Sequence, residues 1–177
     1  TPTLCTSLVV EVLADYRERY PGIDIEILER GSRSLISALV EGTLDLALIV
    51  TSVSPERARA VLEREPILSE RLVIVSSAER PDPFAQRNGT APEAVTLAQL
   101  AEVAQVAFPE NYDLRVAMDA AFGAAGISPT IAVEGAEMDA ALSFAEWGIG
   151  VAVVPAMVAV KRPALRTTQF AAPAAHE

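Results

Sequence analysis

The segment from 16 to 50 alternates helical and extended patterns, and this alternation restricts the chain to an α/β fold. Apolar residues up to Tyr16 recur at the spacing of one helix face, and the helix is expected to end at Pro21-Gly22. Residues 23–27 then alternate isoleucine with acidic residues, which predicts a strand with one buried face.

A second helix and a second strand are expected directly afterwards. Ser32 and Ser34 follow Gly31 and offer N-caps to a short helix, which Gly42 is expected to end. Residues 44–50 are nearly all apolar, as in a parallel strand that is covered on both faces. The stretch therefore predicts one half of an α/β unit.

The rest of the chain repeats this alternation. Thr96 and Gln99 have the spacing of a capping box ahead of a short helix, whereas 81–93 is rich in proline and polar residues and predicts a long exposed loop. Repeated alternation favours parallel sheets with crossover helices, and a change near 72 favours two subdomains. Strands are expected at 72–75, 105–108, 130–133 and 151–154, and helices at 114–125, buried through Leu114, Met118, Ala121 and Phe122, and at 138–147.

Composition limits the partners that this stretch can have. The 177 residues carry a formal net charge of -10 with only 14 Lys and Arg, and binding to phosphate backbones needs clustered cations. No apolar run reaches the roughly 20 residues that span a bilayer, and the first residues show no secretion-type apolar core. The single cysteine, Cys5, excludes an intrachain disulfide, so a cytoplasmic location without membrane association is expected.

Residue types that catalysis or metal binding would need are scarce. The one histidine, His176, lies in a tail of small residues, which argues against a Ser-His-acid triad. A metal site built from His and Cys fails on the same count, because the chain has one of each. Glycine motifs that bind phosphate or dinucleotides do not occur. The sequence therefore predicts a protein that is not an enzyme and has no cofactor or metal.

The remaining candidates for a site are the junctions at which strands pass into helices. In open parallel sheets, ligands bind beyond the carboxyl ends of the strands, where helix N-termini attract anions. Four junctions, at 1–3, 31–34, 108–113 and 135–137, carry short hydrogen-bonding side chains or distinctive turns. The alternative is that each Ser or Thr only caps its own helix, which contributes about 1 kcal/mol apiece.

Several motifs occur in the order and spacing of a known family. Residues 19–22 read RYPG at the end of the first helix, and residues 41–47 read EGTLDLA. Residues 65–68 read EPIL, and residues 145–152 read AEWGIGVA. Over nearly the whole chain, this series resembles the effector-binding domain of LysR-type transcriptional regulators.

The resemblance implies a periplasmic-binding-protein type 2 fold, in which two α/β subdomains have a ligand cleft between them. Subdomain I would comprise 1–72 and subdomain II 73–168, with 169–177 as an incomplete return to subdomain I. The family's first strand would lie before residue 1, and its N-terminal winged helix-turn-helix DNA-binding domain is expected but absent from this chain. The chain is therefore predicted to be a piece of a longer polypeptide.

The resemblance also implies a function, namely the sensing of a small-molecule effector by a homodimeric or homotetrameric regulator that contacts promoter DNA through the absent domain. Arg33 stands early in a helix, where a cation is unfavourable unless an anion is near, so an acidic effector such as a carboxylate is expected. The alternative is that Arg33 points to solvent. A solute-binding protein of an uptake system is the alternative, and an enzyme on this fold is a more distant one. The matched effector-binding positions are Pro2, Thr3, Leu4, Ser32, Arg33, Phe108, Pro109, Asn111, Glu137 and Met138.

Overall fold

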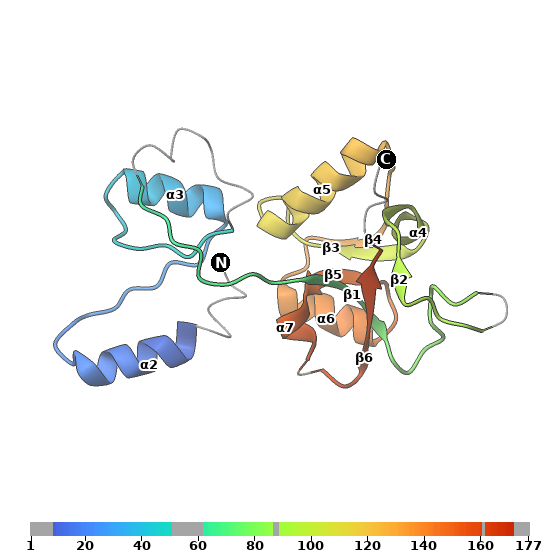
Figure 1. The fold of residues 1–177 in the computed structure, drawn as a ribbon, viewed down its shortest axis with the longest axis horizontal. Coiled ribbons are helices and arrows are strands. Elements are labelled where there is room, and N and C mark those ends of the chain that lie inside the picture. Colours follow the sequence, from blue (N-terminus) through green and yellow to red (C-terminus); the bar gives the residue numbers. More distant parts are fainter. Residues whose placement is uncertain (1–8, 51–61, 87–88, 161, 172–177) are drawn as a thin grey trace. The chain divides into compact units, whose positions relative to one another are not determined.

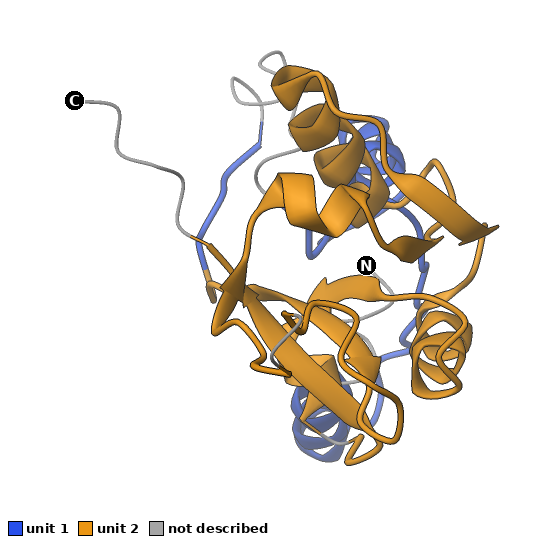
Figure 2. Ribbon diagram, turned by 90° about the vertical axis from the view of Figure 1, so that its right-hand side faces the viewer, with its two compact units in different colours: residues 1–66 blue, residues 67–177 orange. Residues whose placement is uncertain are grey.

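The chain divides into two compact units. A computed structural model describes residues 9–50, 62–86, 89–160 and 162–171. Unit 1 is Thr1–Pro66 and unit 2 is Ile67–Glu177 (Figure 2). The division falls between Pro66 and Ile67, and the expected subdomain bounds of 1–72, 73–168 and 169–177 stay predictions.

Unit 1 contains two described helices, α2 (Val10–Arg19) and α3 (Ser32–Val40). Both were expected from the helical spacing of their apolar residues. Leu35 and Ile36 of α3 are buried, and Gly42 follows the helix with a φ of 71°, a left-handed conformation that favours glycine. The predicted glycine stop is therefore confirmed.

The two strands expected in unit 1 are wrong, because neither 23–27 nor 44–50 forms a strand. Ile23, Ile25 and Ile27 are exposed as well. An alternating sequence becomes a strand only when a neighbour pairs with its backbone N–H and C=O groups. None of the described segments of unit 1 forms such a ladder with these residues.

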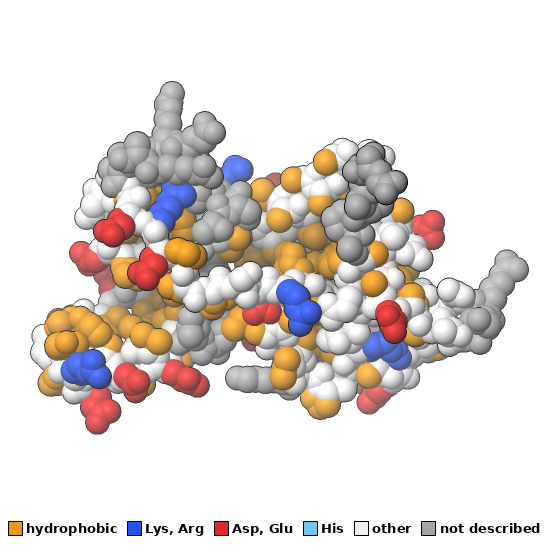
Figure 3. All heavy atoms as spheres, viewed as in Figure 1, with side chains coloured by type: hydrophobic (Ala, Val, Ile, Leu, Met, Phe, Trp, Pro, Cys, Tyr) orange, Lys and Arg blue, Asp and Glu red, His pale blue; other side chains and the backbone are white. Residues whose placement is uncertain are grey.

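Helix α2 exposes apolar as well as charged side chains. It buries none of its residues, and Val10, Val12 and Tyr16 are all exposed. In Figure 3 its apolar side chains gather along one side of the helix, with acidic side chains along the other. The helical period of the sequence was read correctly, but the apolar stripe covers no core within the described part of unit 1.

Unit 2 is built on a sheet whose strands are far apart in the sequence. Four strands lie in the order β2-β6-β1-β5, and β3 pairs with β4 separately. A single bridge between Gln105 and Val151 connects the two groups. The strands are β1 (Leu72–Ser77), β2 (Ala94–Val95), β3 (Ala104–Ala107), β4 (Thr130–Glu134), β5 (Ala152–Pro155) and β6 (Leu165–Phe170).

The expectation of parallel sheets holds for only part of unit 2. β3 pairs with β4 and β2 with β6 in parallel, but β1 is antiparallel to both of its neighbours. Its Ile74 lies opposite Val153 on one side and Thr168 on the other. A continuous apolar run indicates a strand covered on both faces and does not fix its direction. The strand itself was predicted correctly, and its direction was not.

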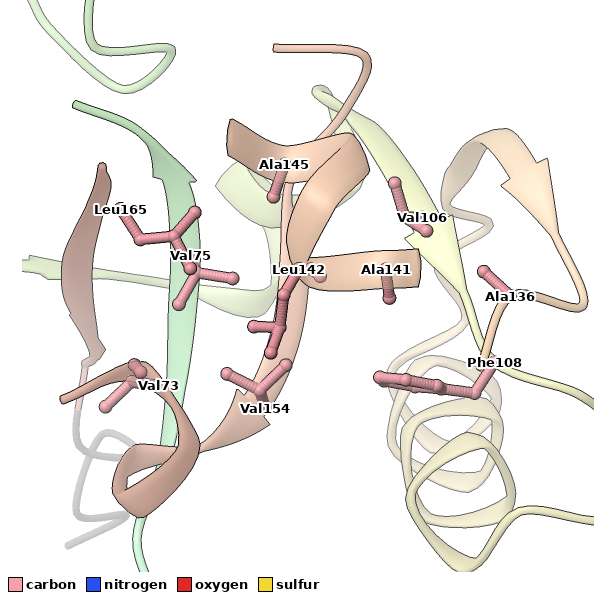
Figure 4. Close-up of a cluster of buried hydrophobic side chains, with 12 residues drawn as sticks. Val73, Val75, Val106, Phe108, Ala136, Ala141, Leu142, Ala145, Val154 and Leu165 are labelled. Atoms are coloured by element: carbon pink, nitrogen blue, oxygen red, sulfur yellow. The ribbon is translucent and has the colours of Figure 1, made fainter. Parts of the chain in front are cut away.

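Helices cover both faces of this sheet (Figure 1). They are α4 (Leu97–Ala101), α5 (Asp113–Ala125), α6 (Met138–Glu146) and α7 (Ala156–Ala159). Val73 and Val75 of β1 pack with Leu142 of α6 in one core cluster, which Figure 4 shows. Ile74 points to the opposite face and packs with Phe122 of α5 in a second cluster. Alternate residues of β1 therefore hold both layers of the core.

Local capping signals in unit 2 were read correctly. Thr96 Oγ1 accepts a hydrogen bond from the Gln99 N–H at 3.2 Å, and the Thr96 N–H donates to Gln99 Oε1 at 2.9 Å, so the capping box before α4 is present. Helix α5 ends at Gly126, which has a φ of 67°. One detail of α5 was wrong, because Ala121 is exposed while its neighbour Phe122 is buried.

Replacing Val154 by Ala should destabilise unit 2, because Val154 is fully buried in the core between β5 and α6. Removing two buried carbon atoms and leaving a cavity is expected to lower the free energy of unfolding by about 2–3 kcal/mol. Val160→Ala is the matched control, since Val160 is 83% exposed and its change should stay within about 0.5 kcal/mol. Urea denaturation followed by circular dichroism measures both, and equal effects would contradict the assigned core.

Candidate functional site

The carboxyl end of β3 brings several of the expected site residues together in unit 2. Phe108 follows β3 directly and is buried, with 3% of its surface exposed. Its ring stacks on Tyr112, with 5.3 Å between ring centroids and an interplanar angle of 9°. Pro109 is half-buried and Asn111 is exposed in the turn between these two rings.

Glu137 and Met138 begin α6 and reach the same place. The Tyr112 hydroxyl donates a hydrogen bond of 2.7 Å to Glu137 Oε2. The Gly135 N–H donates to the Ala107 carbonyl at 3.0 Å, which joins the turn before α6 to the end of β3. Met138 is half-buried and packs against the core cluster of β1 and α6. The parallel pairing of β3 with β4 thus places both junctions at one edge of the sheet.

Tyr112 is a member of this group that the sequence analysis missed. It is the N-cap residue of α5, and its side chain makes no capping hydrogen bond. The available signal was an aromatic residue just beyond Phe108 at the start of a predicted helix. That signal is weak, because an aromatic residue at such a position usually only packs against its helix.

Arg115 binds the backbone at the junction between β3 and α5. Its Nη1 donates to the Phe108 carbonyl at 3.0 Å, and it forms ion pairs with Asp119 and Glu134 at 2.8 Å each. The hydrogen bond to Glu134 is the largest influence on its guanidinium and raises the pKa above the ordinary value, against the lowering effect of burial. Arg115 is thus a positioning residue for Phe108.

In unit 1, Ser32 and Arg33 have different surroundings. Ser32 is fully buried, and its Oγ accepts a hydrogen bond of 2.9 Å from the Val50 N–H. Arg33 beside it is exposed. The predicted serine cap is wrong, because Gly31 is the N-cap of α3 and no side-chain cap hydrogen bond is present. The Ser32 hydroxyl instead forms a hydrogen bond with the backbone of Val50 and so connects Val50 to the start of α3.

Pro2, Thr3 and Leu4 lie outside the described residues, as do Cys5 and His176. In the described ranges, no group of three or more His, Cys, Asp or Glu residues is arranged to hold a metal ion. The helices in those ranges also include none that is both long and apolar enough to cross a membrane.

A small hollow in unit 2 lies beside α5 and borders the candidate site, because Phe108 and Arg115 are among its lining residues. It is lined by residues of β3, α5 and the start of β4, among them Val106, Met118 and Ile131. Its volume of about 30 Å³ is close to that of a single water molecule, which is too small for an organic ligand. The site is therefore better described by the rim than by this hollow.

The rim can bind a ligand but shows no means of chemical turnover. Phe108 is buried, so of the two stacked rings only the half-buried Tyr112 offers surface to a ligand, and its phenol paired with a carboxylate offers hydrogen bonds. Nucleophilic catalysis would need a nucleophile within hydrogen-bond reach of a base, and the Tyr112–Glu137 pair is engaged with itself. The geometry favours recognition.

Comparison with known proteins gives one consistent result. The family described as the LysR substrate binding domain matches residues 1–177. The HTH-type transcriptional regulator YybE of Bacillus subtilis (strain 168) is 30% identical over 153 residues, which are 86% of this chain and 49% of YybE. This chain thus spans about half the length of the curated relatives that it matches.

Solved structures share the fold. The C-terminal domain of a probable LysR family transcriptional regulator from Rhodococcus sp. RHA1 has a TM-score of 0.74 at 24% identity, covering 97% of this chain and 80% of that one. The effector binding domain of QuiR in complex with shikimate has a TM-score of 0.71 at 19% identity, covering 97% and 78%. Both support a periplasmic-binding-protein type 2 fold of two α/β subdomains.

Ser32→Ala should destabilise unit 1 without any ligand present. The substitution removes the acceptor of the Val50 N–H, which is expected to cost about 0.5–1.5 kcal/mol because Val50 is exposed and water can replace the hydroxyl. Ser34→Ala is the control, because Ser34 is exposed on the same helix. Amide hydrogen exchange around Val50, together with a denaturation curve, measures the effect. Unchanged protection at Val50 would show that this hydrogen bond contributes nothing.

Proposed function

Because the chain belongs to the LysR substrate-binding domain family, we propose that it binds a small-molecule effector and passes the signal to a DNA-binding part of the same regulator. Sensing requires only that the effector binds two conformations with different affinity, and no catalytic group is needed. The relatives named above are transcriptional regulators. They give no support to the alternative of a solute-binding protein for uptake.

The observation that carries this proposal is the rim at the carboxyl ends of β3 and β4. Phe108 and Tyr112 stack there, and the Tyr112 hydroxyl bonds to Glu137. In open α/β folds, this is the edge at which ligands bind. The rim is thus the part of the effector site that we propose for unit 2.

The proposed effector site keeps the expected positions and gains Tyr112. From unit 1 it takes the exposed Arg33 and the buried Ser32, whose hydroxyl also fastens Val50. The QuiR domain holds shikimate, which carries a carboxylate, and this supports an acidic effector here. The full set is Pro2, Thr3, Leu4, Ser32, Arg33, Phe108, Pro109, Asn111, Tyr112, Glu137 and Met138.

The proposed setting of the whole protein follows from its family. We place the regulator in the cytoplasm, where promoter DNA is accessible, and we assign DNA contact to a helix-turn-helix domain outside this chain. Self-association as a homodimer or homotetramer is supported by the exposed apolar side chains of α2. Turnover of an effector by the purified protein would contradict the assignment as a regulator that is not an enzyme.

Tyr112→Phe should weaken effector binding by the full-length regulator, because it removes the hydroxyl that holds Glu137 at the rim. A thermal-shift screen of aromatic and aliphatic carboxylates finds a ligand, since saturation at 100 times the dissociation constant adds about 2.7 kcal/mol of stability. Loss of one neutral hydrogen bond should then raise the dissociation constant about 3- to 10-fold, as measured by titration calorimetry.

Tyr20→Phe is the matched control, because Tyr20 is exposed at the end of α2 and lies outside the proposed site. Its dissociation constant should equal that of the wild type. An effector whose affinity is the same in the wild type and in Tyr112→Phe would remove Tyr112 from the site. If no small molecule changes the melting temperature or DNA binding, the sensing function itself is wrong.

A further inference from the structure

Arg115 of α5 contacts three different parts of unit 2 at once. Only 16% of its side chain is exposed. Its Nη1 donates to the Phe108 carbonyl at 3.0 Å, its Nη2 lies 2.8 Å from Glu134 Oε1, and its Nε lies 2.8 Å from Asp119 Oδ2. Each of the three guanidinium nitrogens therefore has an oxygen partner.

Two of these contacts reach the two junctions that form the rim. Phe108 begins the turn that leads from β3 to Tyr112, and Glu134 is the last residue of β4, directly before the turn that leads to Glu137. One side chain thus binds the start of both turns. The position of Arg115, within the first turn of α5, connects this helix to both as well.

The connection made by Arg115 adds to one that the backbone makes. The Gly135 and Ala136 N–H groups both donate to the Ala107 carbonyl, at 3.0 and 3.3 Å. Two side chains extend this connection towards the rim, namely Arg115 and Tyr112, whose hydroxyl donates to Glu137 at 2.7 Å. The Tyr112–Glu137 hydrogen bond is therefore formed between two turns that Arg115 holds in register.

The ion pairs of Arg115 are better suited to fixing geometry than to stabilising the fold. The side chains of Asp119 and Glu134 are 54% and 58% exposed, and solvent screens ion pairs of that kind strongly. A planar guanidinium with its nitrogens bonded in fixed directions nevertheless restricts the orientation of every group that it contacts.

We propose that Arg115 is a positioning residue for the effector site, which sets the geometry of the Tyr112–Glu137 pair before the effector binds. This inference rests on the proposed function, because it states how that same site is kept ready for its ligand. A preorganised site binds more tightly, since less conformational freedom is lost on binding. Arg115 acts through Phe108 and Glu134 and needs no contact with the effector.

Arg166 provides a matched control, because it makes the same kinds of contact elsewhere in unit 2. Its Nη1 donates to the Ser77 carbonyl at 2.9 Å, and its Nε lies 3.7 Å from Asp82 Oδ2. Strand β1 is antiparallel to β5, whereas β3 runs parallel to β5 at the bridge between Gln105 and Val151. Ser77, the last residue of β1, therefore lies at the end of the sheet opposite to the rim.

The test compares Arg115→Lys, Glu134→Gln and Arg166→Lys in the full-length regulator, each with and without Tyr112→Phe. Tyrosine is isotope-labelled at the ring carbon that bears the hydroxyl, and its chemical shift in the ligand-free protein reports the hydrogen bonding of that hydroxyl. The Tyr112 signal is assigned by its absence from Tyr112→Phe. Titration calorimetry then measures the affinity for a carboxylate found by the thermal-shift screen.

Two results are expected together. Arg115→Lys shifts the Tyr112 signal and Glu134→Gln shifts it less in the same direction, whereas Arg166→Lys leaves it in place. Arg115→Lys also raises the dissociation constant about 3- to 10-fold, as does loss of the hydroxyl itself. In the Tyr112→Phe background the same substitution has little further effect, because both changes act through one hydrogen bond.

Other results overturn the inference. A Tyr112 signal that stays in place in Arg115→Lys and in Glu134→Gln would show that Arg115 only stabilises the fold. An equal shift in Arg166→Lys would show a general loosening of unit 2, and an equal loss of affinity in the Tyr112→Phe background would show an action independent of the rim. If Arg115→Lys does not fold, Glu134→Gln decides alone.

Failure of this inference can be distinguished from failure of the proposed function. A ligand whose binding depends on Tyr112 but not on Arg115 or Glu134 leaves the proposed function intact and removes only the positioning role. If the wild type binds no ligand, the proposed function is wrong, and the effector-site role of Arg115 is wrong with it, even where the Tyr112 signal shifts.

Discussion

The burial of β1 is the constraint on which the rest of unit 2 depends. Both edges of β1 are paired, to β5 and β6, and both of its faces are covered by helices. Val73 and Val75 hold one layer of the core and Ile74 holds the other. Strand β5 pairs with β1, and the bridge between Gln105 and Val151 connects β3 to the residue just before β5. The position of β3 therefore depends on β1 through β5. The rim at the end of β3 is thus located by apolar packing on the other side of β5.

Local sequence signals correctly predicted where helices of unit 2 begin and end. They failed for features that depend on pairing with a distant segment. The capping box at Thr96 and the glycine stop at Gly126 act within one turn of helix, so the sequence contains the whole interaction. Residues 23–27 alternate apolar and polar side chains as a strand does, yet they form no strand. The alternation determines which side chains would share a face, but a strand also needs a neighbouring segment to pair with. The direction of β1 was missed for the same reason.

In the candidate site, too, some residues could be predicted from local sequence and others depend on tertiary contacts. Phe108 and Glu137 could be anticipated, because the carboxyl ends of neighbouring parallel strands meet at one edge. Tyr112 was missed, because its stacking and its hydrogen bond depend on the turn between β3 and α5. Ser32 was expected to be a cap and proved to be a buried fastening point for Val50.

The strand order of unit 2 also has a consequence for how the protein is made. Ile74 of β1 lies opposite Val153 and Thr168, both of which are synthesised long after it. While the ribosome is still translating the middle of the chain, β1 leaves it as an apolar segment with no strand to pair with. Such segments recruit chaperones or aggregate, and non-local pairing folds slowly. Strand β1 therefore lacks one of its two partner strands until residue 170 has emerged.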